Sequence, residues 1–162
     1  EYVTTIAKWK LHGAVEDQIH QLCLGFYDVI PLKAIQTFNA LELELLLNGK
    51  PEIDIDEVKN STRYTGGYDV RSPEVKTFWA VFEQMTMKDR AKLLKFITGT
   101  SKVPLDGFDP LFTITKGSDG SDALPRSHTC FNQIVVPPYE TFELCRSKLT
   151  FAIENAVGFH LT

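Results

Sequence analysis

The sequence lacks the features that mark membrane, secreted and nucleic-acid-binding proteins. No apolar run approaches the roughly 18 to 20 residues that a helix needs to cross a bilayer. The first residues, 1–13, show no basic region that leads into an apolar block, as a signal peptide would. Lysine and arginine form no block and the formal net charge is −4, so nucleic acid and membrane insertion are not expected. The chain also lacks an initiator methionine, and we expect it to be part of a longer protein.

Cysteine is scarce. The three cysteines, Cys23, Cys130 and Cys145, are odd in number, far apart, and form no CxxC pair. This pattern argues against a disulfide framework and against a structural zinc site. It fits free thiols in a reducing compartment, so we expect a cytoplasmic or nuclear protein.

Motifs for metals and nucleotides are missing as well. The acidic run that starts near Asp54 has Lys59 at the sixth loop position, where a calcium loop needs glycine. The Gly66-Gly67 pair is followed by no GK[ST] motif, and the histidines show no HExxH spacing. We therefore expect neither a metal nor a cofactor.

The first part of the chain reads as a series of helices. Apolar residues recur at helical spacing in VEDQIHQLCLGFYDVI (15–30) and ALELELLLN (40–48), and Asp54 is placed to cap a short helix that runs through Val58. The segment TRYTGGYDVRSP (62–73) is rich in turn residues and is interpreted as a loop.

Two further helices follow each other closely. Ser72 and Pro73 predict a helix start, and Thr86 with Asp89 three positions on resembles a capping box that starts the next helix. Gly99 is predicted to end that second helix. The expected apolar faces are Val75, Phe78, Trp79, Phe82 and Met85 on the first helix, and Met87, Ala91, Leu94 and Ile97 on the second. The short junction between them predicts a hinge, which comprises Met85, Thr86, Met87 and Lys88.

β-Structure is expected only after Gly99. LFTIT (111–115) and CFNQIVV (130–136) are rich in β-branched and aromatic residues, and a last helix follows that includes Cys145. The fold class is therefore α+β. The predicted organisation is a mostly helical segment at 1–84, the hinge at 85–88, and a small α+β lobe with a short sheet at 89–162.

Among the thiols, Cys130 is the candidate nucleophile. Cys23 and Cys145 fall on apolar helical stripes, where a free cysteine usually behaves as a small buried hydrophobe. Cys130 instead lies where a polar loop meets a predicted strand. Only about 3% of an unperturbed thiol is ionised at pH 7, and positive charge nearby favours the thiolate. Arg126 and His128 could supply such charge, because no acidic residue occurs between positions 125 and 138. His128 has two open roles: a general base beside Cys130, or a residue that shapes the loop.

The segment LPRSHTCFN (124–132), with PPY (137–139) and GF (158–159), resembles the C-terminal lobe of HECT-type ubiquitin ligases. The resemblance extends over the whole chain, in order and spacing. The other matching segments are residues 25–31, ELELLLNG (42–49), TRYTGGY (62–68), FW (78–79) and FITGTSKVPLDGF (96–108).

This resemblance implies that Cys130 accepts ubiquitin from a ubiquitin-conjugating enzyme as a thioester and passes it to a substrate lysine. Phe159 matches a tail phenylalanine implicated in transfer, and 85–88 matches the flexible connection between two lobes. Ser127 and Val135 depart from the family pattern. The residues that match the loop around the acceptor cysteine are Leu124, Pro125, Arg126, His128, Thr129, Phe131 and Asn132. Residues 1–84 resemble only the end of the large lobe, so we expect the fragment to be impaired alone, without the region that docks the conjugating enzyme.

Two other functions remain open. The fragment could be a non-catalytic module that binds ubiquitin or a partner protein; such a module forms no covalent adduct. It could also be a thiol hydrolase, which needs a Cys/His/Asx arrangement and releases free ubiquitin from a conjugate.

Overall fold

The computed structural model describes residues 2–50 and 52–155, and the chain divides into two compact units between Glu44 and Leu45. No helix in the described part is long and apolar enough to span a membrane.

The first unit consists of helices joined by short turns where it is described. Its elements are α1 (Tyr2–Lys8), a π-helix (Trp9–Gly13), α2 (Glu16–Val29), α3 (Leu32–Ile35) and the beginning of α4 (Ala40–Asn48). The predicted helix around 15–30 is confirmed, and Pro31 follows its end. These helices contain no buried residue among those described, and Cys23 is half-buried rather than buried.

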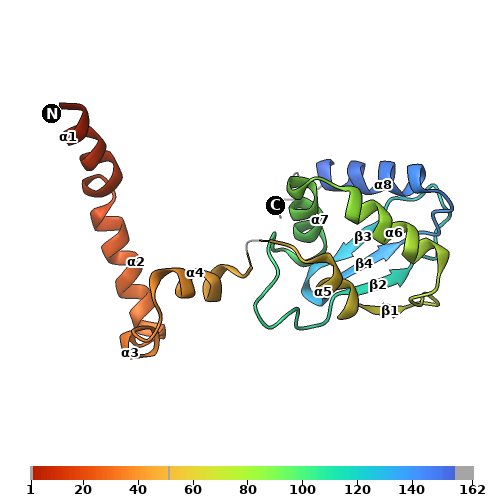
Figure 1. Cartoon of the computed structure of the whole chain (residues 1–162), viewed down its shortest axis with the longest axis horizontal. Helices are drawn as coiled ribbons and strands as arrows, with labels where there is room; N and C mark the ends of the chain where they lie inside the picture. Colours follow the sequence, from red (N-terminus) through yellow and green to blue (C-terminus); the bar gives the residue numbers. More distant parts are fainter. Residues whose placement is uncertain (1, 51, 156–162) are drawn as a thin grey trace. The chain divides into compact units, whose positions relative to one another are not determined.

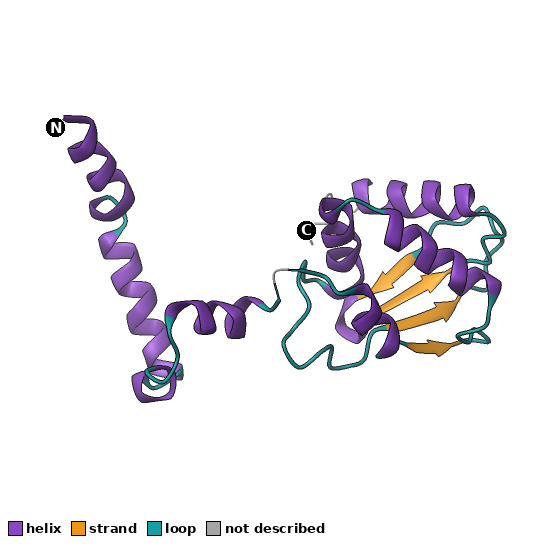
Figure 2. Cartoon of the chain, viewed as in Figure 1, coloured by secondary structure: helices purple, strands orange, loops and turns teal. Residues whose placement is uncertain are grey.

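The second unit is an α+β structure, in which helices pack against a four-stranded sheet (Figures 1 and 2). Its elements are α5 (Ile55–Asn60), β1 (Arg63–Thr65), α6 (Pro73–Gln84), α7 (Met87–Thr98), β2 (Thr113–Lys116), β3 (Arg126–His128), the one-turn 3-10 helix η2 (Thr129–Phe131), β4 (Gln133–Val136) and α8 (Phe142–Asn155). The strand order is β1-β2-β4-β3. Strands β1, β2 and β4 run parallel, and β3 runs antiparallel to β4. The predicted α+β class is confirmed.

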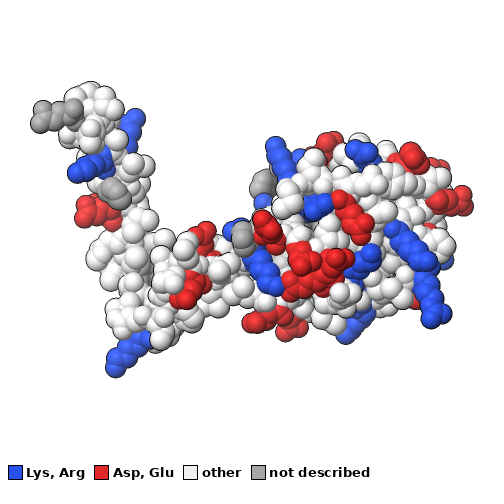
Figure 3. Space-filling view, in the orientation of Figure 1, with Lys and Arg blue, Asp and Glu red and all other residues white. Residues whose placement is uncertain are grey.

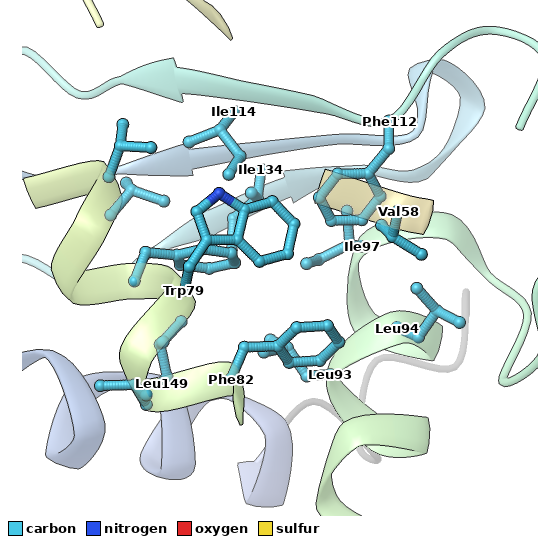
Figure 4. Close-up of a cluster of buried hydrophobic side chains, with 14 of the residues drawn as sticks. Val58, Trp79, Phe82, Leu93, Leu94, Ile97, Phe112, Ile114, Ile134 and Leu149 are labelled. Carbon is cyan, nitrogen blue, oxygen red and sulfur yellow. The ribbon is translucent and has the colours of Figure 1, made fainter. Parts of the chain in front are cut away.

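The core lies between the sheet and the helices. Ile114 of β2 and Ile134 of β4 are register partners and are fully buried beneath Trp79 of α6 (Figure 4). The indole Nε1 of Trp79 donates a hydrogen bond to the hydroxyl of Tyr64 at 3.1 Å, which satisfies the one polar atom of that ring.

The outer face of the sheet is polar. The Nε2 of Gln133 donates to the hydroxyl of Thr115 at 2.6 Å, and the hydroxyls of Thr115 and Thr65 share a hydrogen bond at 2.7 Å. These bonds link side chains of β4, β2 and β1 on this face, from Gln133 at the start of β4 to Thr65. The start of β4 is therefore tied to β2 and, through β2, to β1.

Helix boundaries follow the predicted caps. The Asp54 carboxylate accepts from the N–H of Glu57, and the Thr86 hydroxyl accepts from the N–H of Asp89. The expected burial of Met87 is wrong, because its side chain is 52% exposed while Leu93 is fully buried. Met87 is the first residue of α7 and lies one turn before the part of the helix that reaches the core.

The strand predictions need three corrections. Residues 63–65, predicted as loop, form β1; residues 126–128 form an additional strand, β3; and the strand expected to begin at Cys130 begins at Gln133. Strands β1 and β3 are three residues long and pair on one side only, so they are too short to show an alternating pattern.

The segment 85–88 joins α6 to α7. Both helices contribute to the same core, since Phe82 and Leu93 are at most 2% exposed, whereas the compact units divide between Glu44 and Leu45. The roles of 85–88 as a hinge and as a lobe boundary stay predictions.

Candidate functional site

Cys130 lies in the middle of the 3-10 helix η2, between the antiparallel strands β3 and β4. Its side chain is exposed. The sequence placed it at the head of a strand, and this placement is wrong by three residues because the chain makes a turn before β4 begins. The thiol is therefore presented from a tight turn at one end of the sheet.

Asn132 closes this turn in the left-handed region, with φ 47° and ψ 42°. Its N–H donates to the carbonyl of Thr129 at 3.2 Å, and its carbonyl accepts from the N–H of Thr113 at 2.9 Å. Its side-chain Nδ2 donates to the carbonyl of Pro110 at 2.7 Å. The turn is thus attached to β2 and to the loop that precedes β2.

Helix α7 supports the other end of the turn. It contacts both β3 and η2, and it ends at Gly99, where φ is 81°. A Cβ placed on Gly99 would lie 4.0 Å from the Cβ of Thr129. The turn that carries the thiol is therefore held between a helix end and the sheet.

The loop before the turn is held by residues that are distant in sequence. The Tyr139 hydroxyl donates to the carbonyl of Ala123 at 2.7 Å, and the Lys148 ammonium donates to the carbonyl of Asp122. Pro125 is buried, while the Leu124 side chain is 43% exposed. Leu124 lines a shallow groove with Ser147, Lys148 and Phe151 of α8.

The charge environment differs from the expectation. Arg126 forms an ion pair with Asp119 at 2.5 Å, so the positive charge that was expected to be free near Cys130 is compensated. The carboxylate comes from the preceding loop, outside the stretch 125–138 that contains no acidic residue. On the face drawn in Figure 3, the second unit carries both acidic and basic side chains, and the acidic ones form the largest group.

His128 ends β3, opposite Gln133, and is exposed. His128 and Cys130 are two positions apart, a spacing that puts side chains on one face only in an extended chain, and residues 129–131 form the 3-10 helix η2 instead. In the described part of the chain no hydrogen bond joins His128 to Cys130. Its two suggested roles stay predictions, as does that of Phe159, which lies outside the described residues.

The other thiols are less accessible than Cys130. Cys145 is fully buried, and burial raises the pKa of its thiol to about 12. Cys130 is the one exposed cysteine of the three, all of which are described. Among the described residues, no group of three or more histidine, cysteine or acidic side chains is arranged to hold a metal ion.

Sequence reasoning missed the residues that hold the turn and its loop. Pro110 and Thr113 form these hydrogen bonds through backbone atoms, so their side-chain types do not indicate the contacts. Tyr139 was noted only as part of a PPY segment, and its bond to Ala123 spans 16 positions.

Comparison with known proteins gives a consistent result. The HECT-domain family, described as a ubiquitin-transferase, matches residues 1–162. The E3 ubiquitin-protein ligase ptr1 of Schizosaccharomyces pombe is 49% identical over 98% of this chain, and TOM1 of Saccharomyces cerevisiae is 43% identical over 99%. The mouse E3 ubiquitin-protein ligase HUWE1 is 42% identical over 99%. The chain spans only 4 to 5% of the length of these relatives.

Proposed function

This chain belongs to the HECT-domain family of ubiquitin transferases, and from that premise we propose that Cys130 is the residue that accepts ubiquitin as a thioester and passes it to a lysine of a protein substrate. The observation that carries the proposal is the exposed thiol at the centre of a firmly held turn. A nucleophile that receives a protein cargo must be accessible, and its position must be fixed.

The first step is thioester exchange. The Cys130 thiolate attacks the carbonyl carbon that joins the C-terminal glycine of ubiquitin to the cysteine of a conjugating enzyme. A new C–S bond forms, the old C–S bond breaks, and the conjugating enzyme leaves as a thiolate. Because one thioester replaces another, the free-energy change of the reaction is close to zero. Its rate depends on the positioning of the reacting groups and on the fraction of thiol that is ionised.

The second step forms an isopeptide bond. The neutral ε-amine of a substrate lysine attacks the Cys130 thioester, the C–N bond forms, and Cys130 leaves as a thiolate. The proton released from the amine passes to a base or to water. His128 is the nearest candidate base along the chain, and a role in this step would require it to reach the attacking amine. Neither step consumes a metal or a nucleotide.

The partners follow from these steps. They are ubiquitin, a ubiquitin-conjugating enzyme and a protein substrate. The shallow groove beside Leu124 and Phe151 provides an exposed apolar surface close in sequence to the turn. The free thiols of Cys23, Cys130 and Cys145 fit the cytosol or the nucleus, where such partners would act.

The test uses the full-length protein that contains this chain, incubated with a charged conjugating enzyme. We expect an adduct with ubiquitin that is cleaved by thiol reagents and that mass spectrometry locates at Cys130. Cys130→Ala should abolish it, while the matched variants Cys23→Ala and Cys145→Ala should retain it. An adduct that survives Cys130→Ala rejects the assignment. Binding of ubiquitin without any adduct would instead favour a non-catalytic module.

A further inference from the structure

Asn132 has an unusual combination of features. Within the part of the chain that the structure describes, it is the one non-glycine residue with positive φ, and its side chain is 9% exposed. Glycine adopts this conformation at no steric cost and is the usual residue at such a helix end. An asparagine that combines positive φ with burial therefore indicates a role for its amide group.

The amide group makes one specific contact. Its Nδ2 donates to the carbonyl of Pro110 at 2.7 Å, a separation of 22 positions along the chain. The backbone of the same residue bonds to Thr129 and Thr113. Three hydrogen bonds of one residue therefore hold the end of η2: one closes the turn on Thr129, and two attach it to Pro110 and Thr113. Cys130 and Phe131 lie within the closed turn, between positions 129 and 132.

We infer that Asn132 is a positioning residue for thioester exchange, which acts on Cys130 through its bond to Pro110. The inference rests on the proposed function of Cys130. The hydrogen bond of the amide sets the direction from which the sulfur meets the large ubiquitin-charged conjugating enzyme. It leaves the access of small reagents to the thiol unchanged. A displacement of about 1 Å in a reacting group can lower a rate by about 100-fold, so one well-aimed hydrogen bond suffices for such a role.

Two variants isolate the amide donor. Asn132→Gly keeps the tolerance of positive φ and removes the side chain. Asn132→Asp keeps the shape and much of the φ tolerance, but its carboxylate cannot donate to a carbonyl. The two variants differ in volume and charge and share only the loss of the donor. A common phenotype therefore reports on the bond to Pro110.

A matched control removes a hydrogen bond of the same kind elsewhere. The Tyr68 hydroxyl donates to the carbonyl of Pro137 at 3.3 Å. Pro137 follows the end of β4, whereas the turn precedes its start. Tyr68→Phe therefore removes a buried side-chain-to-carbonyl bond at the opposite end of the strand and leaves the turn unchanged.

The experiment measures three quantities on the full-length protein. The first is the single-turnover rate of ubiquitin loading, as a function of the concentration of charged conjugating enzyme. The second is the rate at which iodoacetamide alkylates Cys130, followed by peptide mapping. The third is the melting temperature, so that all rates are compared where each variant is folded.

We expect both Asn132 variants to lower the maximal loading rate by about tenfold or more. The half-saturating concentration and the alkylation rate should stay within about twofold of wild type, and Tyr68→Phe should load normally. Normal loading by both Asn132 variants overturns the inference. So does a parallel loss of loading and alkylation, or an equal defect in Tyr68→Phe, since either result indicates general loss of structure. If the wild-type adduct is absent from Cys130, the proposed function itself has failed, which is seen before any Asn132 variant is compared.

Discussion

The hydroxyl of Tyr139 donates a hydrogen bond to the carbonyl oxygen of Ala123 at 2.7 Å, and it thereby joins the segment before α8 to the loop that leads to the cysteine turn. Tyr139 is 1% exposed, and burial raises the pKa of its phenol. The hydroxyl therefore keeps its proton and stays a donor at neutral pH.

Tyr139→Phe should lower the free energy of unfolding by about 1 to 2 kcal/mol, because the Ala123 carbonyl loses its donor. Urea denaturation measures the change. The comparison variant is Tyr68→Phe, which loses a longer bond of 3.3 Å to Pro137 and should cost less. Equal losses of unfolding free energy in the two variants would contradict the prediction that the shorter bond to Ala123 contributes more to stability.

Gly49 should be intolerant of any side chain. Its φ is +77°, and a Cβ there would lie 2.5 Å from the carbonyl oxygen of Val103, a backbone atom that is held by a bridge to Lys50. Gly107 is the matched control, because its φ is +82° but a Cβ there meets nothing within 4 Å. Gly107→Ala should cost about 1 to 2 kcal/mol of unfolding free energy from backbone strain alone.

Gly49→Ala should cost clearly more than Gly107→Ala, since it adds a steric clash to the same strain. Both variants are measured by denaturant unfolding of the same protein. A cost at Gly49 no larger than that at Gly107 would mean that the Lys50–Val103 bridge shifts without penalty.

Local signals predicted the helices well. The cap residues Asp54 and Thr86 act through neighbours three positions away, so sequence spacing alone defines their geometry. The apolar face of α6 was predicted from the same kind of spacing, and its members Phe78 and Trp79 are buried.

Signals that depend on distant partners were missed. Strand β1 exists because Arg63 and Tyr64 pair with Thr113 and Ile114, about 50 positions away, and three residues cannot show that pairing by themselves. Cys130 was expected to be reachable and its side chain is exposed, whereas its role as nucleophile stays a prediction and its turn could not be predicted. That turn is held by the hydrogen bond from the side chain of Asn132 to Pro110. The acceptor is a backbone oxygen, which every residue carries, so the residue type at position 110 does not reveal the bond.

Stability should fall at alkaline pH. Burial raises the pKa of the Cys145 thiol from 9.0 to about 12, and burial, with the nearby charge of Glu74, raises that of Tyr68 from 10.0 to about 12. The folded state keeps these protons, whereas the unfolded chain releases them at their ordinary pKa values. The contribution of Cys145 is therefore fully present below about pH 9 and is lost as the pH rises toward 12, by at most about 1.4 kcal/mol per pH unit.

Unfolding measured at a series of pH values tests this dependence. Cys145→Ala should reduce the slope of the free energy of unfolding against pH above about pH 9, because one of the titrating groups is gone. The control is Leu149→Ala, a neighbour on α8 that is also fully buried and does not titrate. It should lower stability at every pH and leave the slope unchanged. An unaltered slope in Cys145→Ala contradicts the assignment.

Phe131 is expected to contact the conjugating enzyme or ubiquitin during loading. Its ring follows Cys130 directly in η2 and is 64% exposed, although a phenyl ring in water forgoes the free energy of burial. Exposed aromatic side chains beside a reactive group are typical anchors of protein interfaces. Phe131→Ala should therefore raise the half-saturating concentration of charged conjugating enzyme by about fivefold to tenfold, equivalent to about 1 to 1.4 kcal/mol.

The same variant should leave the fold intact, because the ring is mostly outside the core. Its free energy of unfolding should stay within about 0.5 kcal/mol of wild type. Val70→Ala serves as the control: Val70 is 60% exposed but lies in the loop before α6, far along the chain from the turn. Phe131→Leu should be intermediate, since it keeps apolar area and loses the ring. The effect of Phe131 variants on the half-saturating concentration distinguishes them from the Asn132 variants, which should lower the maximal rate and leave the half-saturating concentration unchanged. If Phe131→Ala lowers the maximal rate alone, the ring orients the thiol and does not bind the donor.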